Sequence, residues 1–92
     1  MNLTPKQIIE FCQNRKKSYR FYINELKSID SKESFDNLSK KLFDDIFDDE
    51  EFIFDLTFGK TIAKPVLDSL NEVRSVYKMA IQFYKDFKEL RL

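Results

Sequence analysis

Glycine and proline are scarce in this chain, and that scarcity limits its possible folds more than any other feature. One glycine (Gly59) and two prolines (Pro5 and Pro65) occur in 92 residues. The tight turns of sheets and the loops that cradle nucleotides usually need more glycine. Long helices joined by short polar connections are therefore predicted. The length fits one modest core, so residues 1–92 are expected to form a single domain.

Two long helices are predicted in the first half of the chain. Thr4, Pro5 and Gln7 supply a capping box with proline at the first helical position. The helix that follows is expected to run for roughly 24 residues, because apolar residues recur three and four positions apart. Asp30 or Ser31 is predicted to start the second helix. The apolar series are Ile8, Cys12, Tyr19, Tyr22, Leu26 and Ile29 for the first helix, and Phe35, Leu38, Leu42 and Ile46, widened by Phe43 and Phe47, for the second.

A short third helix is predicted between Asp48 and Gly59. Asp48 is a candidate N-cap, acids in the next turn would complement the helix dipole, and Gly59 would end the helix. Phe52, Ile53 and Leu56 would then face inward. Residues 52–58 also carry apolar side chains at every second position, which fits a strand. Because no partner strand is evident, the helix is favoured.

The last helix is predicted to start at Pro65 and to run for about 26 residues. Its apolar arc covers more than half of its circumference, which indicates two packing neighbours: two helices of this chain, or one helix and a second subunit. The predicted fold is therefore all-α, a small bundle of three long helices and one short helix. The arc consists of Val66, Leu70, Val73, Tyr77, Ala80, Tyr84 and Phe87, extended by Val76, Met79, Phe83 and Leu90.

Catalysis is not expected of this sequence. It has no histidine, the commonest general base and metal ligand, and Cys12 falls on the apolar stripe of the first helix. No phosphate-binding or dinucleotide motif occurs, and the acids lack the spacing and glycine of a calcium-binding EF-hand, so no metal and no cofactor are predicted. The longest apolar run is three residues, too short to cross a membrane, and a single cysteine fits the reducing cytoplasm.

Charge is divided sharply along the chain. Residues 29–58 carry ten acids and three lysines, a net charge of −7, whereas residues 1–28 sum to +4 and residues 59–92 to +3. Seven of these acids lie within twelve residues that contain no lysine or arginine, and such crowding destabilises a helix. Two interpretations remain: a solvated helix junction, or an acidic patch that docks on a basic partner and mimics nucleic-acid phosphates. The seven acids are Asp44, Asp45, Asp48, Asp49, Glu50, Glu51 and Asp55.

Four phenylalanines are candidate anchors of such an interface: Phe21, Phe47, Phe54 and Phe58. Arg15 falls inside the apolar series of the first helix, where an unpaired charge would be costly. It is predicted to pair with an acid of the central segment, namely Asp44, Asp45, Asp48 or Asp49, or to extend its stem to the edge of the core.

The first helix offers an alternative, nucleic-acid-binding face. Cations alternate with rings from Arg15 to Tyr22, as they often do in nucleic-acid-binding proteins. Against this, Tyr19 and Tyr22 are expected to turn toward the core, and the sequence pI is about 6.3. The residues of this face are Lys6, Lys16, Lys17, Arg20 and Lys27.

The favoured hypothesis is a small cytoplasmic protein-binding or inhibitory protein that docks its acidic patch on the basic surface of another protein. Toxin-immunity proteins, antitoxins and phage-type inhibitors belong to this class. One alternative is a nucleic-acid-associated regulatory protein that uses the basic first helix. The other is a structural homo-oligomer, such as a homodimer joined along the last helix.

Overall fold

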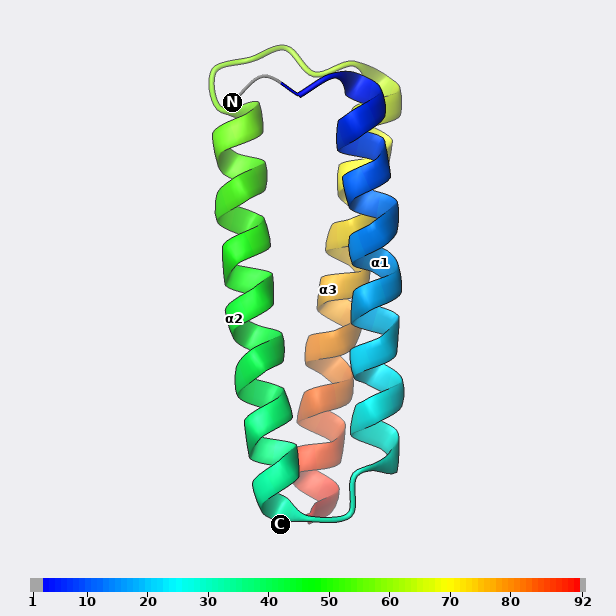
Figure 1. Cartoon of the computed structure of the whole chain (residues 1–92), viewed down its shortest axis with the longest axis vertical. Coiled ribbons are helices and arrows are strands. Elements are labelled where there is room, and N and C mark those ends of the chain that lie inside the picture. The colour runs from blue at the N-terminus through cyan, green and yellow to red at the C-terminus, as the bar shows by residue number, and fades with distance from the viewer. Residues whose placement is uncertain (1–2, 92) are drawn as a thin grey trace.

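Three long helices lie side by side in a bundle of 45 × 18 × 17 Å (Figure 1). The computed structural model describes residues 3–91, with side chains for residues 3–89. The helices are α1 (Pro5–Ser28), α2 (Lys32–Thr57) and α3 (Lys64–Arg91), and they alternate in direction along the bundle. Within this range every regular element is a helix, so the all-α prediction is confirmed.

The helix starts follow the local sequence signals. Thr4 Oγ1 accepts a hydrogen bond from the Gln7 N–H at 3.2 Å, and the Thr4 N–H donates to Gln7 Oε1 at 2.9 Å, which completes the predicted capping box. Ser31 caps α2 by accepting from the Ser34 N–H at 3.2 Å. Pro65 is the second residue of α3. Local capping chemistry therefore determines where α1 and α2 begin, and α3 begins at Lys64, one residue before the predicted start.

The prediction of a separate short helix is wrong, because α2 continues without a break from Lys32 to Thr57. Asp48 caps nothing, since an N-cap must follow non-helical backbone and the segment around it contains no glycine or proline to interrupt the helix. The strand alternative for residues 52–58 is also excluded, as residues 52–57 are helical. Gly59, with φ of +69°, ends the helix as predicted.

A core position filled by an acid explains the error. The buried series of α2 runs Leu42, Ile46, Asp49, Ile53 and Leu56, spaced four, three, four and three residues apart. That is the spacing of one continuous helix face. Because Asp49 interrupts the apolar pattern, the sequence predicts two helices where the structure has one.

The backbones of α1 and α3 lie closer to each other than either lies to α2 (Figure 1). Aromatic rings span the wider separation. Phe11 of α1 contacts Phe52 of α2 with ring centroids 4.8 Å apart, and Tyr84 of α3 meets Phe35 at 5.7 Å and Phe43 at 4.9 Å. Large side chains therefore hold α2 against the other two helices.

Most of the broad apolar arc of α3 packs within this chain. Six of its residues are buried against α1 and α2, which confirms the prediction of two packing neighbours: Val66, Leu70, Val73, Val76, Tyr77 and Ala80. Met79 of the arc is 46 % exposed, and the side chain of Leu90 lies outside the described residues. No helix in residues 3–91 has the length and hydrophobicity needed to cross a bilayer.

Candidate protein-binding surface

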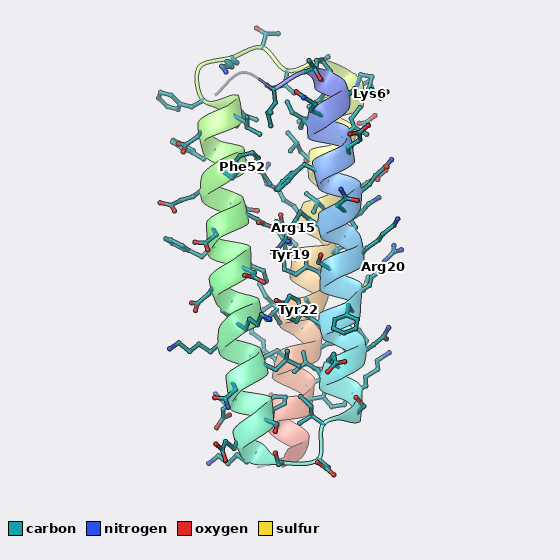
Figure 2. All side chains as sticks on the ribbon, viewed as in Figure 1. Lys6, Arg15, Tyr19, Arg20, Tyr22 and Phe52 are labelled. Carbon is teal, nitrogen blue, oxygen red and sulfur yellow. The ribbon has the colours of Figure 1, made fainter. Side chains whose placement is uncertain are left out.

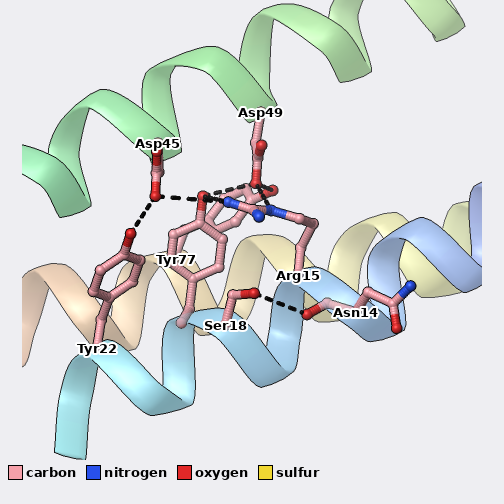
Figure 3. Close-up of polar contacts among 8 residues, drawn as sticks. Asn14, Arg15, Ser18, Tyr22, Asp45, Asp49 and Tyr77 are labelled. Atoms are coloured by element: carbon pink, nitrogen blue, oxygen red, sulfur yellow. Dashed lines mark hydrogen bonds and ion pairs between the residues drawn. The ribbon is translucent and has the colours of Figure 1, made fainter. Parts of the chain in front are cut away.

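A polar cluster joins the three helices (Figure 3), and Figure 2 shows three of its residues, Arg15, Tyr19 and Tyr22, near the middle of the bundle. Asp49 Oδ2 of α2 accepts hydrogen bonds from Arg15 Nε and Tyr19 Oη of α1, both at 2.7 Å, and from Tyr77 Oη of α3 at 3.3 Å. Asp49 is only 8 % exposed. A buried carboxylate needs such partners, because an unpaired charge in the core is costly. The predicted pairing of Arg15 with a central acid is confirmed.

A second carboxylate extends this cluster toward solvent. Tyr22 Oη donates to Asp45 Oδ2, and Arg15 Nη2 lies 3.9 Å from the same oxygen. Arg15 Nη2 also donates to Tyr19 Oη at 3.3 Å. Among the described residues, no buried side-chain polar atom lacks a hydrogen-bond partner. The cluster is therefore internally satisfied, which is the behaviour of a structural element.

The tyrosines of the cluster are held in their protonated form. Burial, then the hydrogen bond to Asp45 and the charge of that carboxylate, raise the pKa of Tyr22 to about 12. Burial and the nearby Asp49 carboxylate raise the pKa values of Tyr19 and Tyr77 above the usual tyrosine range. All three hydroxyls therefore remain hydrogen-bond donors at neutral pH.

Cys12 is fully buried in the core, as expected, and burial raises the pKa of its thiol. A buried thiol with a raised pKa is a poor nucleophile. Across the side chains of residues 3–89, no three Cys, Asp or Glu residues converge in a geometry that could hold a metal ion.

The seven clustered acids divide into three groups around α2. Asp45 and Asp49 point inward to the polar cluster, and Glu50 lies to one side, where its Oε1 pairs with Arg74 Nε at 3.3 Å. The other four point outward, and none forms an ion pair with a described residue. Their spacing of four, three and four places them along one face of the helix. These four residues form the acidic stripe: Asp44, Asp48, Glu51 and Asp55.

Exposed rings accompany the acidic stripe. Phe35 alone of the ten phenylalanines is buried, whereas Phe47, Phe54 and Phe58 are 65 %, 58 % and 71 % exposed. The rings of Phe54 and Phe58 contact each other at 5.1 Å between centroids. Spaced seven and four residues apart, these three side chains lie on one side of α2 and form the phenylalanine ridge. Phe47 lies one helical turn from both Asp44 and Glu51, so ridge and stripe run side by side.

A groove between α2 and α3 borders the ridge at Phe47, on the side away from the acidic stripe. Its volume is about 500 Å³. Glu50, which lines it, is one helical turn from both Phe47 and Phe54, so the groove continues from the ridge. The further lining residues include Ile46 from α2 and Arg74, Tyr77, Lys78 and Ile81 from α3. No sequence pattern reveals this groove, because it forms only when α2 and α3 are packed together.

The basic face of α1 is only partly available. Figure 2 shows Lys6 and Arg20 pointing away from the bundle, whereas Arg15, Tyr19 and Tyr22 point between the helices. Lys16 Nζ pairs with Glu72 Oε2 at 2.8 Å, which lowers the pKa of Glu72 through the hydrogen bond and the lysine charge.

Four cations remain exposed on α1 as the basic stripe: Lys6, Lys17, Arg20 and Lys27. Phe21 beside them is 61 % exposed, and Lys27 Nζ lies 4.8 Å from the ring centroid of Phe83. Tyr19 and Tyr22 are buried, as predicted, and so cannot stack on nucleic-acid bases.

Comparison of the chain with protein-family models, with curated proteins and with solved structures finds no match.

Proposed function

We propose that this chain is a small binding protein that acts by covering a basic surface of another protein, as toxin-immunity proteins, antitoxins and phage-type inhibitors do. The observation that carries the proposal is the outward face of α2. It presents three exposed phenylalanines beside four carboxylates that pair with no described cation. Of the seven acids, the acidic stripe is available to a partner, while Asp45 and Asp49 are engaged inside the bundle.

The hydrophobic core of the bundle does not use this face. The inner face of α2 already supplies its core contacts through residues such as Leu42 and Ile53. Like charges one helical turn apart destabilise a helix by about 0.2–0.5 kcal/mol per pair, and the acidic stripe contains three such pairs. An exposed phenylalanine also forgoes about 1.5–3 kcal/mol of burial. A partner that buries the rings and neutralises the acids would recover both losses.

The two features would act at different steps of binding. Unpaired carboxylates steer a basic partner during encounter, which raises the association rate and makes it dependent on salt. The rings of the phenylalanine ridge would then be desolvated, which slows dissociation. A small inhibitor needs both effects, because it has to reach its target quickly and remain bound.

The test is recovery of a partner from nuclease-treated native lysate by three forms of the chain. The first is the wild type, and the second removes the acidic stripe through Asp44→Asn, Asp48→Asn, Glu51→Gln and Asp55→Asn. A control variant removes four other exposed acids through Glu10→Gln, Asp36→Asn, Asp68→Asn and Glu89→Gln. Both variants raise the net charge of the chain by four units, so they differ only in where the acids are removed.

One protein retained by the wild type and by the control, and lost by the stripe variant, is the expected result. The affinity of that protein for the wild type should also fall as salt rises, because exposed charges are screened. Equal recovery by all three forms would reject the proposal and leave the acidic stripe as a solvated helix face.

A further inference from the structure

The outward face of α2 is bordered by opposite charges on its two long sides. The acidic stripe lies along one side of the phenylalanine ridge. On the other side, Lys78 and Lys85 of α3 are exposed, lie seven residues apart on one face of their helix, and form no ion pair with a described residue. These two lysines are the cationic edge. Acids, rings and cations therefore follow one another across one face of the bundle.

The cationic edge lies level with part of the acidic stripe along the bundle. Lys78 lines the groove together with Ile46 of α2. Lys85 is the neighbour of Tyr84, whose ring contacts that of Phe43 at 4.9 Å between centroids. The two lysines are therefore level with the end of the stripe that holds its first two acids.

A second copy of this chain complements such a face when the two bundles lie parallel. A two-fold axis that runs parallel to α2 places the acidic stripe of each copy opposite the cationic edge of the other, and each residue of the ridge opposite its own counterpart. Because this rotation shifts nothing along the axis, groups that are level in one copy stay level across the interface. A two-fold axis across α2 would instead set stripe against stripe, which is unfavourable.

The exposed rings supply much of the area that such a dimer needs. Phe47, Phe54 and Phe58 are 65 %, 58 % and 71 % exposed, and a phenylalanine buries about 150–250 Å² in a core, so the ridge offers about 300–480 Å² per copy. Two copies contribute about 600–960 Å², whereas a stable interface buries about 1,200–2,000 Å² in total. The charged side chains along both edges have to supply the remainder, which makes this a small interface.

We infer that a second copy of this chain covers the face, in a parallel dimer that joins the two phenylalanine ridges and sets each acidic stripe against a cationic edge. The charge match is incomplete, because four carboxylates meet two lysines. The dimer is therefore weak, and a partner with a more basic surface displaces the second copy. This displacement rests on the proposed function, since the second copy then regulates access to the same face.

Sedimentation of the purified chain over a range of concentrations tests the dimer. The wild type should change from monomer to dimer between about 1 and 100 µM, as a small interface allows. Phe54→Ser with Phe58→Ser, at positions outside the core, should raise the dissociation constant about 10-fold or more. Phe21→Ser is the matched control, because this phenylalanine of α1 is 61 % exposed and lies off the face, and it should leave the constant unchanged.

Charge reversal tests the pairing of the edges. Asp44→Lys with Asp48→Lys leaves lysines on both sides of the ridge, and Lys78→Glu with Lys85→Glu leaves acids on both. Each variant alone should dimerise about 10-fold more weakly than the wild type, because like charges then meet. An equimolar mixture of the two should form a heterodimer at least as tight as the wild-type dimer, because each basic side then meets an acidic one.

Cross-linking tests the parallel orientation. Phe58 lies at one end of the ridge, so it meets its counterpart in a parallel dimer and the opposite end of the ridge in an antiparallel one. A short bis-maleimide should link two copies of Phe58→Cys but not two copies of Phe21→Cys. Cys12 does not compete, because it is fully buried.

A monomer at the upper end of the concentration range, a dimer insensitive to the ridge substitutions, or a mixture no tighter than its components would overturn the inference. So would equal cross-linking of the two cysteine variants. The proposed function is tested separately, by whether recovery of a lysate partner requires the acidic stripe. Lys78→Glu with Lys85→Glu keeps that stripe and weakens the dimer, so it should recover such a partner at least as well as the wild type; lower recovery would refute the displacement alone.

Discussion

Removing the charge of Asp49 tests whether the polar cluster holds α2 on the bundle. Asp49→Asn keeps the size of the side chain but loses the ion pair with Arg15 and presents an amide where three donors converge on one oxygen. Breaking a buried ion pair from one side costs about 3–5 kcal/mol. The lower end of this range applies, because the Arg15 side chain is 26 % exposed and its Nη2 lies 3.9 Å from Asp45 Oδ2, so its charge keeps some solvent and a second acid nearby.

The expected loss is therefore about 3 kcal/mol in the free energy of unfolding. A chain of 92 residues has a total stability of about 5–14 kcal/mol, so the variant should retain its fold with a melting temperature lower by roughly 12–24 °C. Urea unfolding followed by far-ultraviolet circular dichroism measures the difference. Asp48→Asn is the matched control, since this neighbouring acid is exposed, and it should change stability by less than about 0.5 kcal/mol.

Replacing both partners separates the ion pair from the packing. The double variant Arg15→Met with Asp49→Leu leaves no buried charge without a partner. Its loss in the free energy of unfolding should therefore be about 1–2 kcal/mol smaller than the sum of the losses of the two single variants. Additive losses, or an Asp49→Asn variant as stable as Asp48→Asn, would contradict the role given to the cluster.

Three further outcomes follow from single features of the fold. Because the folded-state pKa of Tyr22 is about 12 against about 10 in the unfolded chain, stability should hold up to about pH 10 and fall between pH 10 and 12. In pH-dependent unfolding, Tyr22→Phe should make this fall less steep, and an unchanged slope would refute the coupling. Gly59→Ala should cost about 1 kcal/mol in urea unfolding, since φ is +69° while no neighbouring atom obstructs a Cβ; no loss would show that the turn relaxes. A mobility-shift assay at low salt should show no binding to DNA or RNA, because Tyr19 and Tyr22 are buried and cannot stack on bases; a shift abolished by Lys17→Ala with Arg20→Ala would establish the alternative function.

Features that depend on neighbouring residues were predictable from sequence. The caps at Thr4 and Ser31 arise from hydrogen bonds within a few residues, whereas α3 begins at Lys64, one residue before the predicted start at Pro65. The inward position of Arg15 and its need for an acid also followed, because a charge within an apolar helix stripe requires a partner. Which acid it selects depends on how α1 and α2 are aligned, and the sequence pattern does not contain that information.

The acidic segment was misread because one of its members belongs to the core. With Asp49 counted as an inward residue, the series from Leu42 to Leu56 is unbroken, and one long helix follows from its period. The division of the seven acids follows in turn, since residues at 44, 48, 51 and 55 must then face away from the core. The signal that could have revealed this was Arg15, an unpaired cation in the stripe of the helix before.

This division changes how the segment has to be tested. A variant that neutralised all seven acids would remove the partners of Arg15 and Tyr22 together with the acidic stripe. If that variant lost binding, the cause could equally be weaker packing of α2 on the bundle or removal of the binding surface. Neutralising the outward four alone should relieve three like-charge pairs and leave the chain equally or slightly more stable. Binding lost by a variant that is no less stable than the wild type can be attributed only to the surface, and that combination separates a docking face from a structural one.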